Sequence, residues 1–208
     1  EDGTIKFLWE LQDGNAVETG VCNGYFVENC WCYQLYDTGV THQCSKGDGN
    51  REQKNIRYLG NLIEYCHWGI EFYNSPDTTT PYPNGSPYVR TTSDVHDAYN
   101  VVRNTGYGWG SVIKNRMIGS QGYCGSSLSD NFDELTEYNI FDRSAGNLLF
   151  LPSNAKETQS RNIYIQYEGN YLGNLRGSHM KCDTDFAENI RKLWGDKEAV
   201  IVMIQKKD

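Results

Sequence analysis

Apolar and polar residues alternate along much of the first 45 positions of the chain. The segment "TIKFLWEL" at 4–11 places its apolar side chains on one face with a period of two, and "YFVENCWCYQLY" at 25–36 is rich in aromatic residues. Asp13-Gly14 and Asn23-Gly24 interrupt these runs, and such dipeptides favour tight turns because their residues tolerate a positive φ. We therefore expect the N-terminal part to form β-hairpins.

Three later stretches have the spacing of amphipathic helices. Positions 93–104 begin with a capping residue, Ser93, and place small apolar residues on one side. Positions 129–141 have a similar pattern, and positions 183–195 end at a glycine, Gly195, which commonly stops a helix. These patterns predict about three helices.

The remaining apolar runs predict β-strands, and no internal repeat is apparent. We expect strands at 88–93, 147–151, 162–167 and 199–204, and a short helix followed by a strand at 55–74. Because strands outnumber helices and occur in blocks, the predicted fold class is α+β, predominantly antiparallel β with about three helices and disulfide-stapled N-terminal hairpins.

A chain of 208 residues is long enough to bury one core, so we expect a single domain over 1–208. Four of the five prolines fall within "NSPDTTTPYPNGSPY", so the loop at 74–88 is a possible boundary between two subdomains.

Seven cysteines suggest an oxidising compartment, since cytosolic proteins rarely carry so many without a metal site. The disulfide candidates are Cys22, Cys30, Cys32, Cys44, Cys66, Cys124 and Cys182. We expect at least two disulfides among the first five and a pair between Cys124 and Cys182. A zinc site at Cys30, Cys32, His42 and Cys44 is disfavoured, because a single residue between two cysteines is unlike the usual zinc-binding spacing. The chain is thus predicted to be secreted or exposed at the cell surface, with no metal and no cofactor.

The net charge of −8 and the lack of a long basic stretch argue against a nucleic-acid partner. No apolar run approaches the roughly 20 residues of a membrane-spanning helix, so no membrane insertion is expected.

The segment "GSQGYCGSS" resembles the nucleophile region of papain-like proteases at Gln121, Gly122 and Cys124. However, Ser127 occupies the position of the family's nucleophilic cysteine, and His179 is the only histidine downstream. A nucleophile needs a nearby base, so we predict that neither Cys124 nor Ser127 is catalytic.

A second enzymatic pattern combines "YVRTTS" at 88–93 with Gln166-x-Glu168. It resembles the Ser-Thr-Ser strand and the Gln/Glu-x-Glu pair of bacterial ADP-ribosylating toxins of the cholera and pertussis type. The resemblance implies that Glu168 is catalytic, with Gln166 and Ser93 supporting it. A secreted ADP-ribosyltransferase-like toxin domain is therefore the alternative function.

The favoured function is binding without catalysis. The chain has 15 tyrosines and five tryptophans, and "NTGYGWGS" places Tyr107 and Trp109 between glycines. Aromatic rings presented in this way stack on the C–H faces of sugars, while nearby polar groups bind hydroxyls. We expect a carbohydrate or glycoprotein ligand, bound by a lectin- or adhesin-like domain at Tyr107 and Trp109, with Trp68 as a further wall of the site.

Overall fold

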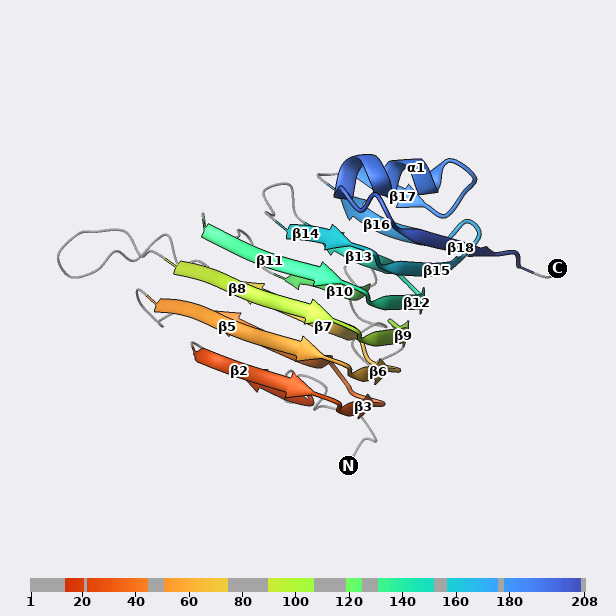
Figure 1. Cartoon of the computed structure of the whole chain (residues 1–208). Coiled ribbons are helices and arrows are strands. Elements are labelled where there is room, and N and C mark those ends of the chain that lie inside the picture. The colour runs from red at the N-terminus through yellow and green to blue at the C-terminus, as the bar shows by residue number, and fades with distance from the viewer. Residues whose placement is uncertain are drawn as a thin grey trace, which may run out of the picture.

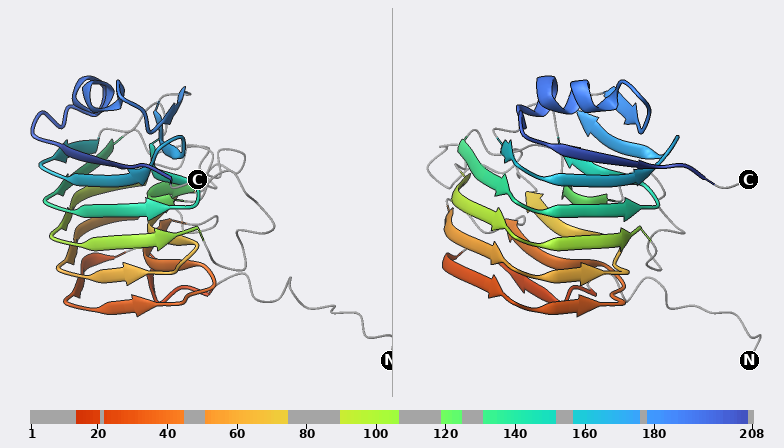
Figure 2. Two further views of the ribbon diagram at one scale, coloured as in Figure 1. Left: turned by 90° about the vertical axis from the view of Figure 1, so that its right-hand side faces the viewer. Right: turned by 45° about the vertical axis from the view of Figure 1, so that its right-hand side comes forward.

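The computed structural model shows a three-sheet parallel β-helix whose coils stack from the N-terminus to the C-terminus (Figure 1). The structure describes residues 14–20, 22–44, 51–74, 90–106, 119–124, 131–151, 157–175 and 178–206. Each complete coil passes through one strand of sheet B, one of sheet C and one of sheet A, in that order along the chain. Figure 2 shows the coils from two further sides.

Three sheets, A, B and C, form the sides of the β-helix. In spatial order, sheet A contains β1 (Val17–Thr19), β4 (Thr38–Cys44), β7 (Trp68–Asn74), β10 (Gly119–Cys124), β13 (Asn147–Leu151), β16 (Tyr171–Leu175) and β17 (Ser178–Lys181). Sheet B contains β14 (Glu157–Ser160), β11 (Asn131–Glu137), β8 (Arg90–Ala98), β5 (Arg51–Leu59) and β2 (Asn23–Glu28). Sheet C contains β18 (Val200–Ile204), β15 (Ile163–Tyr167), β12 (Ile140–Ser144), β9 (Val101–Thr105), β6 (Leu62–Glu64) and β3 (Trp31–Tyr33).

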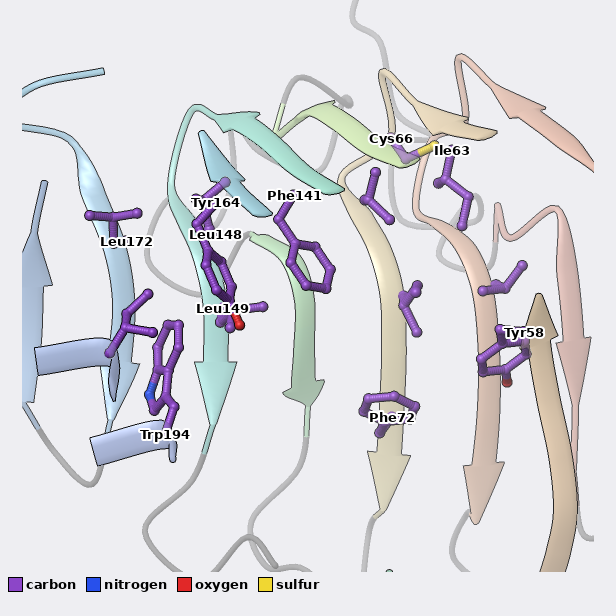
Figure 3. Close-up of a cluster of buried hydrophobic side chains, with 14 of the residues drawn as sticks. Tyr58, Ile63, Cys66, Phe72, Phe141, Leu148, Leu149, Tyr164, Leu172 and Trp194 are labelled. Carbon is purple, nitrogen blue, oxygen red and sulfur yellow. The ribbon is translucent and has the colours of Figure 1, made fainter. Parts of the chain in front are cut away.

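Strand residues alternate between the interior and the outer surface of the β-helix. In sheet C, residues Cys32, Ile63, Val102, Phe141 and Tyr164 lie in register on successive strands, and all are buried. Figure 3 shows part of the resulting core, a row of inward side chains that runs from Tyr58 to Trp194. Period-two alternation thus places one face of these strands in a continuous core.

The corner between sheets B and C has the same backbone geometry in five successive coils. Asn29, Gly60, Tyr99, Tyr138 and Arg161 occupy this corner, and all have φ between 54° and 67°. We call these five residues the left-handed column. Each is followed by the residue that begins the turn into sheet C.

Four of these following residues are buried asparagines that form a ladder parallel to the axis of the β-helix. The ladder consists of Asn61, Asn100, Asn139 and Asn162. Each side-chain oxygen accepts a hydrogen bond from the backbone N–H of the preceding coil, at 2.8–2.9 Å. Buried Asp196 ends the ladder by accepting from the backbone N–H groups of Arg161 and Asn162.

A short helical segment covers the C-terminal end of the core. It comprises α1 (Phe186–Asn189) and the π-helical η2 (Ile190–Trp194), and Phe186, Ile190 and Trp194 are buried. The predicted helix at 183–195 is confirmed. The strand predicted after it is also confirmed, as β18, in which Val200 and Val202 are exposed. Within the described ranges, no helix has the length and apolar character of a membrane span.

The predicted antiparallel α+β fold class is wrong. All described strand pairs are parallel except β16 with β17. The helices predicted at 93–104 and 129–141 are also absent. The first segment forms the end of β8 and most of β9, and the described part of the second forms β11 and the start of β12.

A left-handed residue explains both wrong helices. Tyr99 and Tyr138 turn the chain sharply between two strands, so buried residues on either side of a corner, such as Val95, Ala98 and Val102, all face the core. Their spacing then imitates the period of an amphipathic helix. The short helix predicted within 55–74 is strand as well, in β5, β6 and β7.

The N-terminal segments also differ from the predicted hairpins. Strands β2 and β3 are adjacent in sequence but belong to different sheets, and each pairs with a strand from the next coil. The predicted strand at 4–11 and nearly all of the proline-rich loop at 74–88 lie outside the described residues.

The buried imidazole of His42 makes stability sensitive to acid. It lies between Phe72 and Tyr58, and Nδ1 is 3.0 Å from the Tyr58 hydroxyl. Burial lowers the pKa of His42 to about 3 and that of His67 to about 4, from an ordinary value of 6.5. Both rings therefore remain neutral in the folded chain at pH 5, whereas they become protonated in the unfolded chain.

The part of the free energy of unfolding that depends on these two histidines should therefore have its full value above pH 6.5. It should fall as the pH drops toward their two folded-state pKa values. Each histidine contributes a slope of up to about 1.4 kcal/mol per pH unit. Urea unfolding at pH 7, 6 and 5 measures this slope, and His42→Phe should reduce it by about half. An unchanged slope in His42→Phe would show that His42 does not cause the acid sensitivity.

Candidate functional site

The residues predicted to bind a ligand do not form a described site. Tyr107 and Trp109 lie outside the described residues. Trp68 begins β7 and is only 3% exposed, with its ring edge-to-face against His67 at 6.2 Å. Trp68 is therefore part of the packed interior of the chain and does not present a free ring face.

The residues of the alternative enzymatic site are not brought together on one surface. Ser93 is half-buried in β8 of sheet B, where it is not the N-cap of a helix. Gln166 is fully buried in β15, and its amide donates to the carbonyl oxygens of Ser144 and Tyr171 at 3.1 and 2.9 Å. Glu168 is exposed in the turn that follows β15.

The predicted disulfide framework is also wrong. Cys22, Cys30, Cys32, Cys66 and Cys182 are all free thiols, so the Cys124–Cys182 pair does not form. Three of these cysteines, Cys32, Cys66 and Cys182, are buried in the core as small apolar residues, and burial raises the pKa of Cys66 to about 12. The argument from cysteine number to export therefore has no support, and localisation stays a prediction.

The side chains of Cys44 and Cys124 do not belong to the described part of the structure. In the described part of the chain, no group of three or more His, Cys, Asp and Glu side chains could hold a metal ion.

Three exposed aromatic residues gather on the outer face of sheet C near its N-terminal end. Strand β3 directs Cys32 inward, so its neighbours Trp31 and Tyr33 both point outward. Tyr65 follows β6 in the next coil and has φ 54°. The exposed fractions are 67% for Trp31, 44% for Tyr33 and 42% for Tyr65. We call these three residues the aromatic cluster.

The rings of the aromatic cluster contact one another in sequence. The ring centroids of Trp31 and Tyr33 are 5.5 Å apart, and those of Tyr33 and Tyr65 are 5.7 Å apart in an edge-to-face arrangement. These distances are typical of favourable aromatic pairs. The cluster therefore holds its rings in a defined arrangement while leaving much of their surface open to solvent.

A carboxylate and a guanidinium lie beside the aromatic cluster. Tyr33, Glu64, Arg103 and Asp142 are in register on four successive strands. Glu64 is buried, and its two oxygens accept from Trp31 Nε1 at 3.0 Å and from Arg103 Nε at 2.6 Å. The bond to Glu64 raises the pKa of Arg103, so this side chain stays charged.

This arrangement combines ring faces with fixed polar groups. Arginine carries five N–H donors, and only Nε of Arg103 is bonded to Glu64. The side chain of Arg103 is partly exposed, so its remaining donors can reach a ligand. Beside it lies a half-buried apolar row in register with Trp31, which consists of Leu62, Val101, Ile140 and Ile163. The surface suits a ligand that has both apolar faces and hydrogen-bonding groups.

Sequence reasoning missed this site although its signal was present. The alternation Trp31-Cys32-Tyr33 places both aromatic side chains on one face of any strand. Tyr65 and Arg103 join them only because the next two coils stack on β3, which no local pattern shows.

Comparison with protein-family models, with curated proteins and with solved structures gives no match for this chain. No relative therefore supports the lectin-like or secreted character predicted above. The case for a function depends on the geometry of the outer face of sheet C.

Proposed function

We propose that this protein binds a glycan on the outer face of sheet C. The observation that carries the proposal is the aromatic cluster of Trp31, Tyr33 and Tyr65, which is largely exposed and lies next to a buried, doubly hydrogen-bonded carboxylate. Contiguous exposed clusters of large aromatic side chains mark candidate interaction sites. A glycan fits because sugar rings have apolar C–H faces that stack on aromatic rings and hydroxyls that pair with polar groups.

The scaffold favours binding without large rearrangement. Trp31 and Tyr33 stand on a strand of a continuous sheet, and Trp31 is further held by its bond to Glu64. Rigid presentation lowers the entropy that binding costs. The net charge of −8 favours a neutral glycan over a polyanionic one.

Replacing Trp31 with alanine tests the proposal. We expect Trp31→Ala to weaken glycan binding by about 1–3 kcal/mol, or roughly 5- to 150-fold, because a stacking ring is lost. The melting temperature should fall only modestly, because the ring is mostly exposed and its removal opens to water the Glu64 oxygen that it bonded. A glycan array identifies the ligand, and titration calorimetry then measures the affinity of both proteins.

Phe26→Ala is the matched control. Phe26 is 55% exposed on β2, but it lies on sheet B and none of the ring pairs of the described residues includes it. This variant should bind as the wild type does. Absence of any glycan binding by the wild type, or equal losses in Trp31→Ala and Phe26→Ala, would refute the proposal.

A further inference from the structure

The left-handed column forms a continuous line along the corner beside the aromatic cluster. Backbone N–H groups of Asn29, Gly60, Tyr99 and Tyr138 each donate to a carbonyl at the same corner of the next coil, at 2.9–3.4 Å. Consecutive members are thus separated by one coil, or about 4.8 Å. Their side chains project from the corner at equal intervals, except where Gly60 has none.

The C-terminal half of the column is a stack of flat groups. The rings of Tyr99 and Tyr138 are stacked, with centroids 5.3 Å apart and planes 7° apart. Arg161 lies over the other face of Tyr138 at 5.4 Å and donates to its hydroxyl at 2.9 Å. Tyr99 is the last ring of this stack, and its second face points toward the coil of Gly60.

Gly60 has no side chain at the neighbouring position of the column, toward which this face of Tyr99 points. A Cβ built on Gly60 would lie 2.8 Å from Oδ1 and 3.8 Å from Cγ of Asn29, so the Asn29 side chain already leans over the Gly60 position, and no Tyr99 atom lies within 4 Å of that Cβ. Tyr99 itself is 61% exposed. The column therefore lacks one side chain between the Asn29 amide and the Tyr99 ring, and this space is open to solvent.

We propose that this gap, bounded by Asn29, Gly60 and Tyr99, is a second sugar-binding subsite that takes one pyranose ring. The ring would stack on Tyr99, in the place where the column lacks a side chain, and its hydroxyls would pair with the Asn29 amide. A sugar fits both walls, because one is an aromatic face and the other a hydrogen-bonding amide. The inference rests on the proposed glycan-binding function and extends its site.

The subsite is continuous with the aromatic cluster. Asn29 lies two residues before Trp31, and Gly60 lies four residues before Glu64 on the same coil. Because Gly60 is at the corner before β6, about 3.3 Å per residue sets an upper limit of about 13 Å on the distance from Gly60 to Glu64. A single sugar unit can occupy only one of the two subsites, whereas an oligosaccharide can reach both.

Two substitutions test the subsite, and one of them, Gly60→Asn, also displaces the Asn29 side chain, whose Oδ1 would lie 2.8 Å from the new Cβ. Gly60→Asn fills the gap with a residue that tolerates a left-handed backbone, and Tyr99→Asn removes the ring with the same tolerance. The probe is a series of one to six units of the sugar that binds best on a glycan array. Each variant should weaken binding of the longer oligosaccharides about tenfold and leave monosaccharide binding at the aromatic cluster unchanged. Tyr99→Phe keeps the ring and should bind normally.

Gly169→Asn is the matched control, since Gly169 also has a positive φ, at 78°, and a Cβ there meets nothing within 4 Å. It should leave every affinity unchanged. Failure of the wild type to bind any glycan would remove the proposed function itself. The second subsite alone would be overturned if Trp31→Ala lost binding while Gly60→Asn and Tyr99→Asn kept wild-type affinity for long oligosaccharides.

Discussion

Replacing Asn100 with alanine should lower the free energy of unfolding by about 4 kcal/mol. Asn100 is buried in the middle of the ladder, where its Oδ1 accepts from both the backbone N–H and the side-chain amide of Asn61 at 2.9 Å. Its own amide donates to the carbonyl of Tyr58 at 2.8 Å and to Oδ1 of Asn139 at 3.0 Å. Alanine leaves these partners buried, and each unsatisfied group costs about 1–3 kcal/mol unless water reaches it.

Equilibrium denaturation with urea measures this loss. Asn23→Ala is the control, because Asn23 is an exposed asparagine on β2 and should change stability by no more than about 0.5 kcal/mol. Similar midpoints for the two variants would mean that the ladder contributes little to stability. Since the ladder joins successive coils, we also expect Asn100→Ala to loosen the coils on both sides of it, as hydrogen exchange can detect.

Replacing Trp194 with alanine should be similarly damaging, by about 3–5 kcal/mol. Trp194 lies at the end of η2, packed at 5.6 Å from Tyr164. It also covers Gly173 so closely that a Cβ there would lie 2.5 Å from the indole ring. Its removal opens a cavity at the C-terminal end of the core, where the next coil would otherwise stack.

The uncapped end should also promote association between molecules, because terminal units of solenoid proteins need a cover to remain soluble. Light scattering and thermal unfolding at several protein concentrations measure both effects. Trp194→Phe should cost much less. The indole Nε1–H is buried without a hydrogen-bond partner, so phenylalanine removes an unpaired donor and breaks no hydrogen bond. Lys192→Ala, at an exposed position of the same helix, should behave as the wild type. A Trp194→Ala protein that stays monomeric and stable would show that α1 and η2 do not act as a cap.

Local sequence signals predicted the elements whose partners lie nearby. The C-terminal helix was identifiable because Phe186, Ile190 and Trp194 form one face and Gly195 ends it with φ 73°. The same signals misassigned 93–104 and 129–141, where a corner between two strands imitates helical spacing. Cysteine counting failed for a related reason: in this chain buried thiols fill core positions, and composition alone cannot distinguish that use from pairing.

The repeat remained hidden because the coils differ in length. Ladder asparagines are 39 residues apart from Asn61 to Asn100 and from Asn100 to Asn139, but only 23 apart from Asn139 to Asn162. What recurs is a left-handed residue followed by asparagine, and the left-handed residue itself varies among glycine, tyrosine and arginine. A motif of this kind has no constant period and little identity from coil to coil.

The sequence by itself determined the alternation of inward and outward side chains, the position of the C-terminal helix and the placement of Trp31 and Tyr33 on one face of a strand. These properties depend on neighbours within a few residues, so a local pattern contains them. Only the tertiary structure decided that the strands pair in parallel, that the asparagines stack, and that Tyr65 and Arg103 join the surface around Trp31. Each of these contacts links residues about one coil or more apart, and coil stacking, which buries the core and satisfies the corner amides, brings them together.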